Sequence, residues 1–213
     1  MRTLVVGCDA SGKTTMLHEI SERYGDIQIE STRSPRAIAF KHASFGRTVD
    51  ASFVDERESL YLSLGEEVMR QTNQANLASK NTVSSDATLV TRLSHGIMRT
   101  LIQDSSFSND AIVGKWREDE EKYGISIPDV VILTSPPFEI IKERMIQRQK
   151  SGQKHEEFKG FNSLHFLEAY YNGWLSVFST ISEMVHSSVI IDTSLITPQE
   201  SLEVYAQYRP PQD

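Results

Sequence analysis

The chain alternates short apolar segments with longer segments in which apolar residues recur every three or four positions. The short segments are rich in β-branched residues, as in strands buried on both faces, and the longer ones have the spacing of helices. This alternation predicts an α/β fold in which parallel strands are joined by crossover helices. The expected strands are residues 3–7, 26–31, 81–86, 128–135 and 187–194, and the expected helices are 14–25, 52–79, 91–104, 138–150 and 162–186.

Some segments give a weaker pattern. Gly65 interrupts the expected helix 52–79, which allows a kink there. Residues 33–48 contain too much turn chemistry to assign, and hold either a short helix or part of a pocket wall. The charged segment 105–126 is expected to be a loop or an excursion, and the tail 207–213 is expected to fray. In the last expected helix, the packing stripe is predicted to be Leu164, Leu167, Tyr171, Leu175, Phe178, Ser182 and Val185.

Composition limits the classes of protein. A length of 213 residues with 38% hydrophobic content suits a single α/β domain over 1–213. One cysteine excludes an internal disulfide, and no Cys/His cluster suggests structural zinc. No signal-peptide pattern and no long apolar run is present, so we expect a cytoplasmic protein without membrane contact. The net charge of −7 argues against broad binding of polyanions but allows a local basic pocket.

The stretch GCDASGKTT, residues 7–15, lies between the first expected strand and its helix and satisfies G-x-x-x-x-G-K-[ST]. In this context, glycines let backbone N–H groups turn around a phosphate, and the helix start adds partial positive charge. Lys13 then reaches the outer phosphates, and Thr14 offers its hydroxyl to Mg²⁺. The pattern predicts a site for ATP and Mg²⁺ formed by Gly7, Ala10, Ser11, Gly12, Lys13, Thr14 and Thr15.

Three charged residues are further candidates. Arg144 and Arg148 are four residues apart on one helical face, so both could reach the same phosphates; the alternative is a solvated basic face paired with nearby glutamates. Asp86 ends an expected central strand at the edge where nucleotide sites lie. It could hold Mg²⁺ or accept a proton, or else be a turn or cap aspartate.

Beyond the loop, several segments resemble the thymidylate kinase-like nucleotide kinases in order and spacing. The loop is similar to that family's G-x-D-G-[AS]-G-K-[ST]-T. TRSPR (32–36) resembles its Arg-Glu-Pro segment, FVDERESLY (53–61) its "ADR" helix, and residues 128–149 its strand and R-x-x-x-R lid entry. The resemblance implies a three-layer P-loop NTPase fold: a central parallel sheet of about five strands, helices on both faces, and a short lid at about 148–160.

The resemblance also implies roles for residues. Asp9 would lie beside the acceptor's sugar, Arg33 and Arg57 at its phosphate, and Phe53 near its base. The residues that it marks as catalytic are Lys13, Asp86, Arg144 and Arg148, with Thr14 and Asp86 at the metal. The chain departs from the family in SSDAT (84–88), where Ala87 stands in place of an arginine. Arg92, one to two helical turns further on, is a candidate to supply that charge at the acceptor.

The expected function is transfer of the γ-phosphoryl group of ATP, with Mg²⁺, to a deoxynucleoside monophosphate such as dTMP. One alternative is a kinase of a hydroxyl acceptor, either a deoxynucleoside or 5-hydroxymethyluracil in DNA as in some phage relatives, with Asp86 or Glu30 as the base. Another is a non-catalytic ATP-binding regulator. The partners implied are small nucleotides, with nucleic acid only under the hydroxyl alternative, and a homodimer is compatible because dimers occur in that family.

Overall fold

The computed structural model describes residues 1–29, 35–44, 46–85, 87–103, 108–151 and 163–209. Its centre is one parallel sheet with the strand order β2-β3-β1-β4-β5. The five strands confirm the strands that the sequence predicts, with shorter bounds at most ends. They are β1 (Arg2–Gly7), β2 (Ile27–Ile29), β3 (Thr82–Ser84), β4 (Val130–Thr134) and β5 (Ser187–Ile191).

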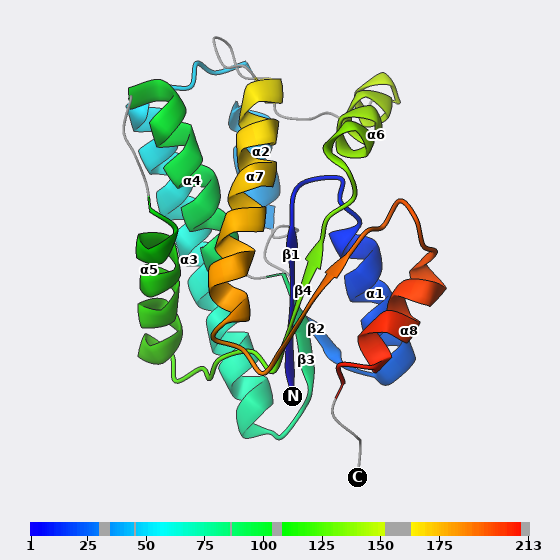
Figure 1. The fold of residues 1–213 in the computed structure, drawn as a ribbon. Coiled ribbons are helices and arrows are strands. Elements are labelled where there is room, and N and C mark those ends of the chain that lie inside the picture. The colour runs from blue at the N-terminus through cyan, green and yellow to red at the C-terminus, as the bar shows by residue number, and fades with distance from the viewer. Residues whose placement is uncertain (30–34, 45, 86, 104–107, 152–162, 210–213) are drawn as a thin grey trace.

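Helices cover both faces of this sheet (Figure 1). The helices in the described ranges are α1 (Lys13–Tyr24), α2 (Pro35–Ser44), α3 (Ala51–Leu77), α4 (Ala87–Gln103), α5 (Asn109–Lys122), α6 (Phe138–Lys150), α7 (Ser163–Ser182) and α8 (Pro198–Ala206). Alternate residues of β1 explain the layers, because successive side chains of a strand point to opposite faces. Val5 packs with α1 and α8, whereas Leu4 and Val6 pack with α4, α5 and α7. The three-layer α/β fold that the sequence predicts is therefore confirmed.

Helix α5 corrects the expectation of a loop at 105–126. Ile112 and Val113 lie one helical turn before Trp116, and all three are buried against α4 and α7, with Trp116 fully enclosed. Ser108 caps the helix by accepting a hydrogen bond from the Ala111 N–H at 3.0 Å. The segment is rich in charge because its other side faces solvent. In the sequence, these charged residues make the narrow apolar face difficult to recognise.

Helix α7 is found where the sequence predicts it, but its buried face differs from the predicted stripe. Leu164 and Leu175 are exposed by 50% and 38%, so they do not belong to the core. The buried side chains are Leu167, Tyr170, Trp174, Val177, Phe178 and Ile181. The large rings of Tyr170 and Trp174 pack edge to face on this side of the helix, with centroids 5.9 Å apart.

Gly65 does not interrupt α3, which runs without a break from Ala51 to Leu77. Its role is a close approach between helices. A Cβ atom at this position would overlap the Cγ2 methyl of Thr88 and lie 3.3 Å from the Thr88 backbone nitrogen, at the start of α4. The missing side chain therefore lets α3 and α4 pack closely.

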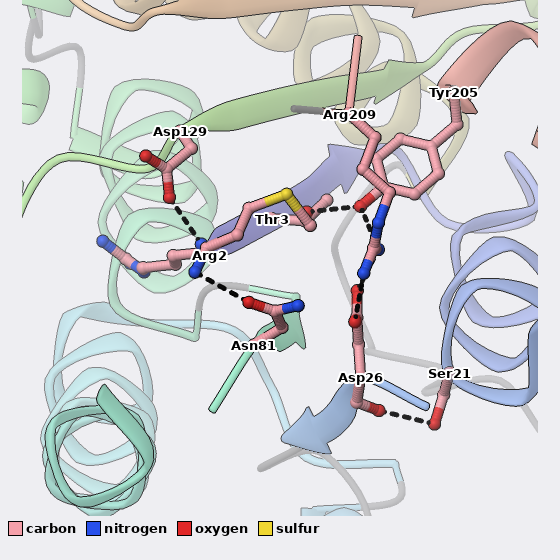
Figure 2. A network of polar contacts seen from close by, with 9 residues as sticks. Arg2, Thr3, Ser21, Asp26, Asn81, Asp129, Tyr205 and Arg209 are labelled. Carbon is pink, nitrogen blue, oxygen red and sulfur yellow. Dashed lines mark hydrogen bonds and ion pairs between the residues drawn. The ribbon is translucent and has the colours of Figure 1, made fainter. Parts of the chain in front are cut away.

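The amino end of the sheet is tied to the C-terminal helix by polar contacts (Figure 2). Arg209 donates to both carboxylate oxygens of Asp26, at 2.7 and 2.9 Å, and this ion pair is almost fully buried. Thr3 and Tyr205 share a buried hydrogen bond of 2.8 Å. The expectation that the tail frays from residue 207 is therefore wrong for Arg209, because a bidentate charged pair fixes it; residues 210–213 lie outside the described ranges.

We expect Gly65→Ala to destabilise the protein by about 1–3 kcal/mol, because overpacking at Thr88 outweighs the better helix propensity of alanine. The measurement is the free energy of unfolding in urea. Gly114→Ala in α5 is the matched control, because a Cβ there meets no atom within 4 Å. It should stabilise the protein by up to about 1 kcal/mol. Equal effects of the two substitutions would contradict the close approach at Gly65.

Candidate active site

The loop between β1 and α1 has an unusual backbone. Gly7 and Gly12 have φ values of 139° and 97°, and Ala10 has a φ of 62°. A Cβ on Gly7 would lie 2.5 Å from the carbonyl oxygen of Thr134, so only glycine fits there. Ala10 holds a left-handed conformation at a cost of about 1–2 kcal/mol. Strain of this kind persists only where the surroundings fix the loop.

Hydrogen bonds from two neighbouring strands fix it. The Ser11 hydroxyl lies 2.7 Å from the Thr134 hydroxyl, which donates to the Val6 carbonyl at 3.2 Å. Thr193, just after β5, donates from its hydroxyl to the Ser11 carbonyl at 2.8 Å. The loop is therefore held to the carboxyl ends of β4 and β5, the edge of an open parallel sheet where ligands bind.

Lys13, the first residue of α1, folds back over the loop. Its Nζ donates to the carbonyl oxygens of Gly7 at 2.7 Å and Cys8 at 2.5 Å. Burial lowers the pKa of Lys13, while the nearby Asp9 carboxylate raises it. The cation is thus held at the start of a helix, where backbone N–H groups already favour an anion.

A cavity of about 280 Å³ opens beside the loop. The loop and α1 contribute Ala10, Gly12 and Thr15, and α6 contributes Arg144 and Arg148. The far wall is Thr193 with Ile196, Pro198 and Ser201 at α8. The structure therefore brings together two arginines and a phosphate-type loop that are about 130 residues apart in the sequence.

The two arginines differ in their surroundings. Arg144 donates from Nη1 to the Ala10 carbonyl at 3.2 Å and to the Thr193 hydroxyl at 3.1 Å, and from Nη2 to the Thr193 carbonyl at 2.9 Å. Arg148, one turn later, lines the same cavity but is exposed. Arg144 is therefore part of the wall, whereas Arg148 can reach into the cavity.

The residues expected at the acceptor lie in several places. Asp9 is exposed at the loop. Phe53 is 1% exposed, packed on Phe40 with ring centroids 6.0 Å apart, and has the Arg47 guanidinium 4.9 Å from its ring centroid. It therefore belongs to the core, with no open face for a base.

Of the arginines expected at the acceptor, Arg57 and Arg92 lie in the described ranges, and both contact other side chains. Arg57 on α3 contacts His95 Nε2 at 3.0 Å, and its guanidinium lies 4.9 Å from the Tyr61 ring centroid. Arg92 on α4 donates from Nε and Nη2 to Asp119 of α5, at 2.8 and 2.6 Å. Arg33 and Asp86, with Glu30 as the alternative base, lie outside the described residues.

Sequence patterns alone missed three residues around this site. Thr193 follows the last predicted strand, and its position after a buried strand is the only signal that pointed to it. A lone histidine on a helix is more often structural than functional, so the sequence pattern does not single out His95. Tyr170 of α7 is buried near the loop, and burial, with Asp9 and Cys8 nearby, raises its pKa well above the usual range. Arg57 has the opposite effect on Tyr170, so the loop and Arg57 lie within electrostatic reach of the same phenol.

The donor set near the loop suits Mg²⁺ bound together with phosphates. Thr14 is exposed in the first turn of α1. No group of three or more His, Cys, Asp or Glu residues is gathered in the part of the chain that the structure describes. The exposed hydroxyl of Thr14 is compatible with Mg²⁺, which keeps several waters and takes only one or two protein ligands alongside substrate phosphates. In the same described ranges, no helix is long and apolar enough to cross a membrane.

Solved structures share this architecture. Deoxyadenosine kinase from M. mycoides, with the products dCMP and a flexible dCDP bound, matches with a TM-score of 0.67 and 12% identity over 97% of both chains. The same enzyme with dATP bound has a TM-score of 0.61, again at 12% identity, over 97% of this chain and 98% of that one. A candidate kinase from Chloroflexus aurantiacus matches with a TM-score of 0.60 and 12% identity over 98% of both chains.

No protein-family model and no curated protein matches the sequence. The structural matches, at 12% identity, show the fold alone. The chain therefore shares the fold of these kinases: a five-stranded parallel sheet between layers of helices.

The reactivity of Cys8, the only cysteine in the sequence, reports whether the loop shields this thiol from solvent. It is 2% exposed, and burial, helped by Asp9, raises the pKa of its thiol to about 12. We expect a thiol reagent at pH 8 to modify the folded protein at least about 100-fold more slowly than the guanidinium-unfolded protein, because the thiolate is the reacting form. Stopped-flow absorbance gives both rates, and Cys8→Ala gives the background. Equally fast modification of both states would contradict a closed loop.

Proposed function

We propose that this chain is an ATP-dependent phosphotransferase with a deoxynucleoside-type acceptor, working as a single P-loop kinase domain over 1–213. The observation that carries the proposal is the junction of β1 and α1, where a glycine loop held by hydrogen bonds and Arg148 border one cavity, and Lys13 lies against the carbonyls of the same loop. A fold alone does not define an activity, so the proposal rests on this site.

The loop residues Gly7, Ala10, Ser11 and Gly12, with Thr14 and Thr15, would hold the phosphates of ATP by their backbone N–H groups at the start of α1. Lys13 now donates to two loop carbonyls, and a bound phosphate would offer it a charged acceptor instead. Thr14 and Asp86 would hold Mg²⁺, which would neutralise charge on the phosphates. The adjoining cavity would take the nucleoside part of ATP.

Catalysis would depend on alignment and charge neutralisation, as is usual for phosphoryl transfer. Arg144 would position the loop, because the hydrogen bonds that it donates to Ala10 and Thr193 tie α6 to the loop and to the segment after β5. Arg148 would neutralise charge on the transferring phosphoryl group as the lid at about 148–160 closes. Most of that lid lies outside the described residues.

A deoxynucleoside hydroxyl is the acceptor that we favour. The arginine that the thymidylate kinase-like family has next to the aspartate after its third strand is replaced here by Ala87, and its candidate substitute, Arg92, is paired with Asp119. Both facts remove positive charge from the place where an acceptor phosphate would bind. The M. mycoides enzyme, with dCMP as a product, has a matching fold. A hydroxyl needs a base, for which Asp86 and Glu30 are the candidates.

A deoxynucleoside monophosphate such as dTMP is the second candidate. Arg57 favours it, because its guanidinium is fixed on α3, near the loop-side phenol of Tyr170. A phosphate acceptor is already ionised and needs no strong base. The two candidates are distinguished by incubating the protein with labelled ATP, Mg²⁺ and a panel of deoxynucleosides, deoxynucleoside monophosphates and DNA containing 5-hydroxymethyluracil.

Lys13→Ala should reduce phosphoryl transfer to the preferred acceptor by at least about 10³-fold, because it removes the only cation on the loop. The assay is transfer of label from ATP, and the urea midpoint should stay close to that of the unsubstituted protein. Unchanged turnover would refute the assignment. Tight ATP binding without transfer to any acceptor would favour the non-catalytic regulator instead.

Arg148→Ala should lower kcat by about 10–100-fold with a smaller change in the Kd for ATP, because its charge would act mainly on the transferring group. Lys142→Ala is the matched control. It removes the same charge from α6, where Lys142 pairs with Glu139 and does not line the cavity. A change in ATP affinity alone would count against this role of Arg148.

A further inference from the structure

Two helices on the far side of the loop hold a histidine and an arginine against each other. His95 of α4 is fully buried, and its Nε2 lies 3.0 Å from Nη1 of Arg57 on α3. The other ring nitrogen, Nδ1, lies 2.6 Å from the backbone carbonyl oxygen of Thr91, one turn earlier on α4. Both nitrogens of a buried side chain are therefore committed to defined partners.

These partners determine the protonation state of the ring. A carbonyl oxygen only accepts hydrogen bonds, so Nδ1 carries the hydrogen that the Thr91 carbonyl accepts. A guanidinium only donates, so Nε2 is the unprotonated nitrogen that accepts from Arg57. A hydrogen on Nε2 would place two donors face to face. His95 is therefore a neutral imidazole with its hydrogen on Nδ1.

The electrostatic surroundings agree with this state. Burial, together with the charge of Arg57, lowers the pKa of His95 to about 3, although the bond to Thr91 favours the charged ring. Arg99, the other arginine near the ring, lowers it further and pairs with Asp55 and Glu58 of α3. A neutral histidine can fix the direction of a guanidinium and leave its positive charge intact. A carboxylate in the same place would neutralise that charge.

Arg57 is also fixed from a second side. Its guanidinium lies 4.9 Å from the centroid of the Tyr61 ring, and this ring and that of His95 are 6.5 Å apart. An aromatic face attracts a cation and limits its rotation. His95 and Tyr61 thus hold the guanidinium from two sides, and the charge of Arg57 acts on the phenol of Tyr170, on which the loop residues Asp9 and Cys8 also act.

We propose that His95 is a positioning residue, whose Nε2 lone pair orients the Arg57 guanidinium toward the bound acceptor. The inference rests on the proposed function, because only a phosphotransferase has an acceptor at this place. It adds a histidine to the acceptor side of the site and assigns it a tautomer. His95 acts through Arg57 and does not itself touch the reacting atoms.

The test compares two variants of His95 in steady-state kinetics with ATP, Mg²⁺ and the preferred acceptor. His95→Leu removes the acceptor atom, and we expect the acceptor KM to rise by about 10-fold or more with the KM for ATP unchanged. His95→Gln places an amide oxygen near the position of Nε2, and it should recover most of the loss. In the Arg57→Ala background, His95→Leu should cost less than 2-fold, because the coupled partner is already gone.

Thr72→Val is the structural control. It removes a buried hydrogen bond from the Thr72 hydroxyl to the Val68 carbonyl on α3, away from Arg57, and should change stability without changing the acceptor KM. An equal rise of both KM values in His95→Leu, or an acceptor KM within 2-fold of the unsubstituted protein, would overturn the positioning role. Absence of any transfer by the unsubstituted protein would overturn the proposed function as well.

A measurement that needs no variant tests the tautomer directly. Ring ¹⁵N resonances of the unsubstituted protein at pH 7 should show His95 with Nδ1 protonated and Nε2 unprotonated. An imidazolium, or a hydrogen on Nε2, would overturn the proposal even where His95→Leu fails to fold.

Discussion

The site depends on one constraint: the chain must leave the central strand β1 and start α1 through a backbone that ordinary residues avoid. Three residues of the loop have positive φ, and one of them, Ala10, carries a side chain. Such a turn persists because β4 and β5 hold it through the hydroxyls of Thr134 and Thr193. The strain and the hydrogen bonds that offset it therefore lie at the same edge of the sheet.

The same constraint explains the layout around the loop. Because β1 is central, helices far from it in the sequence reach its carboxyl edge: α6 brings the arginines, and α8 closes the far wall of the cavity. Arg144 ties α6 to the loop and to Thr193, so a displacement of α6 would disturb the loop directly. Polar contacts at the opposite edge, including the buried pair of Arg209 with Asp26, fix the position of α8 against the sheet (Figure 2).

The side where we propose that the acceptor binds is built differently from the loop side. Side chains of α3, α4 and α7 meet there. Their orientation depends on how closely the helices pack, as α3 and α4 do where Gly65 meets Thr88. His95 and Tyr61 fix Arg57, while Arg92 is taken up by Asp119. A small rotation of α4 would thus change which cations face the acceptor, which is a physical route by which kinases of one fold can differ in substrate.

The sequence by itself determined the five strands, most of the helices and the loop, because each depends on local spacing: β-branched runs, turns of 3.6 residues, and glycines at fixed offsets around Lys13. It did not determine α5, whose charged exposed side hides the face of Trp116, or the buried face of α7. Nor did it reveal that Phe53 is a core residue or that His95 contacts Arg57. Those features are contacts between residues far apart in the chain, and only tertiary packing decides which side of a helix meets which neighbour.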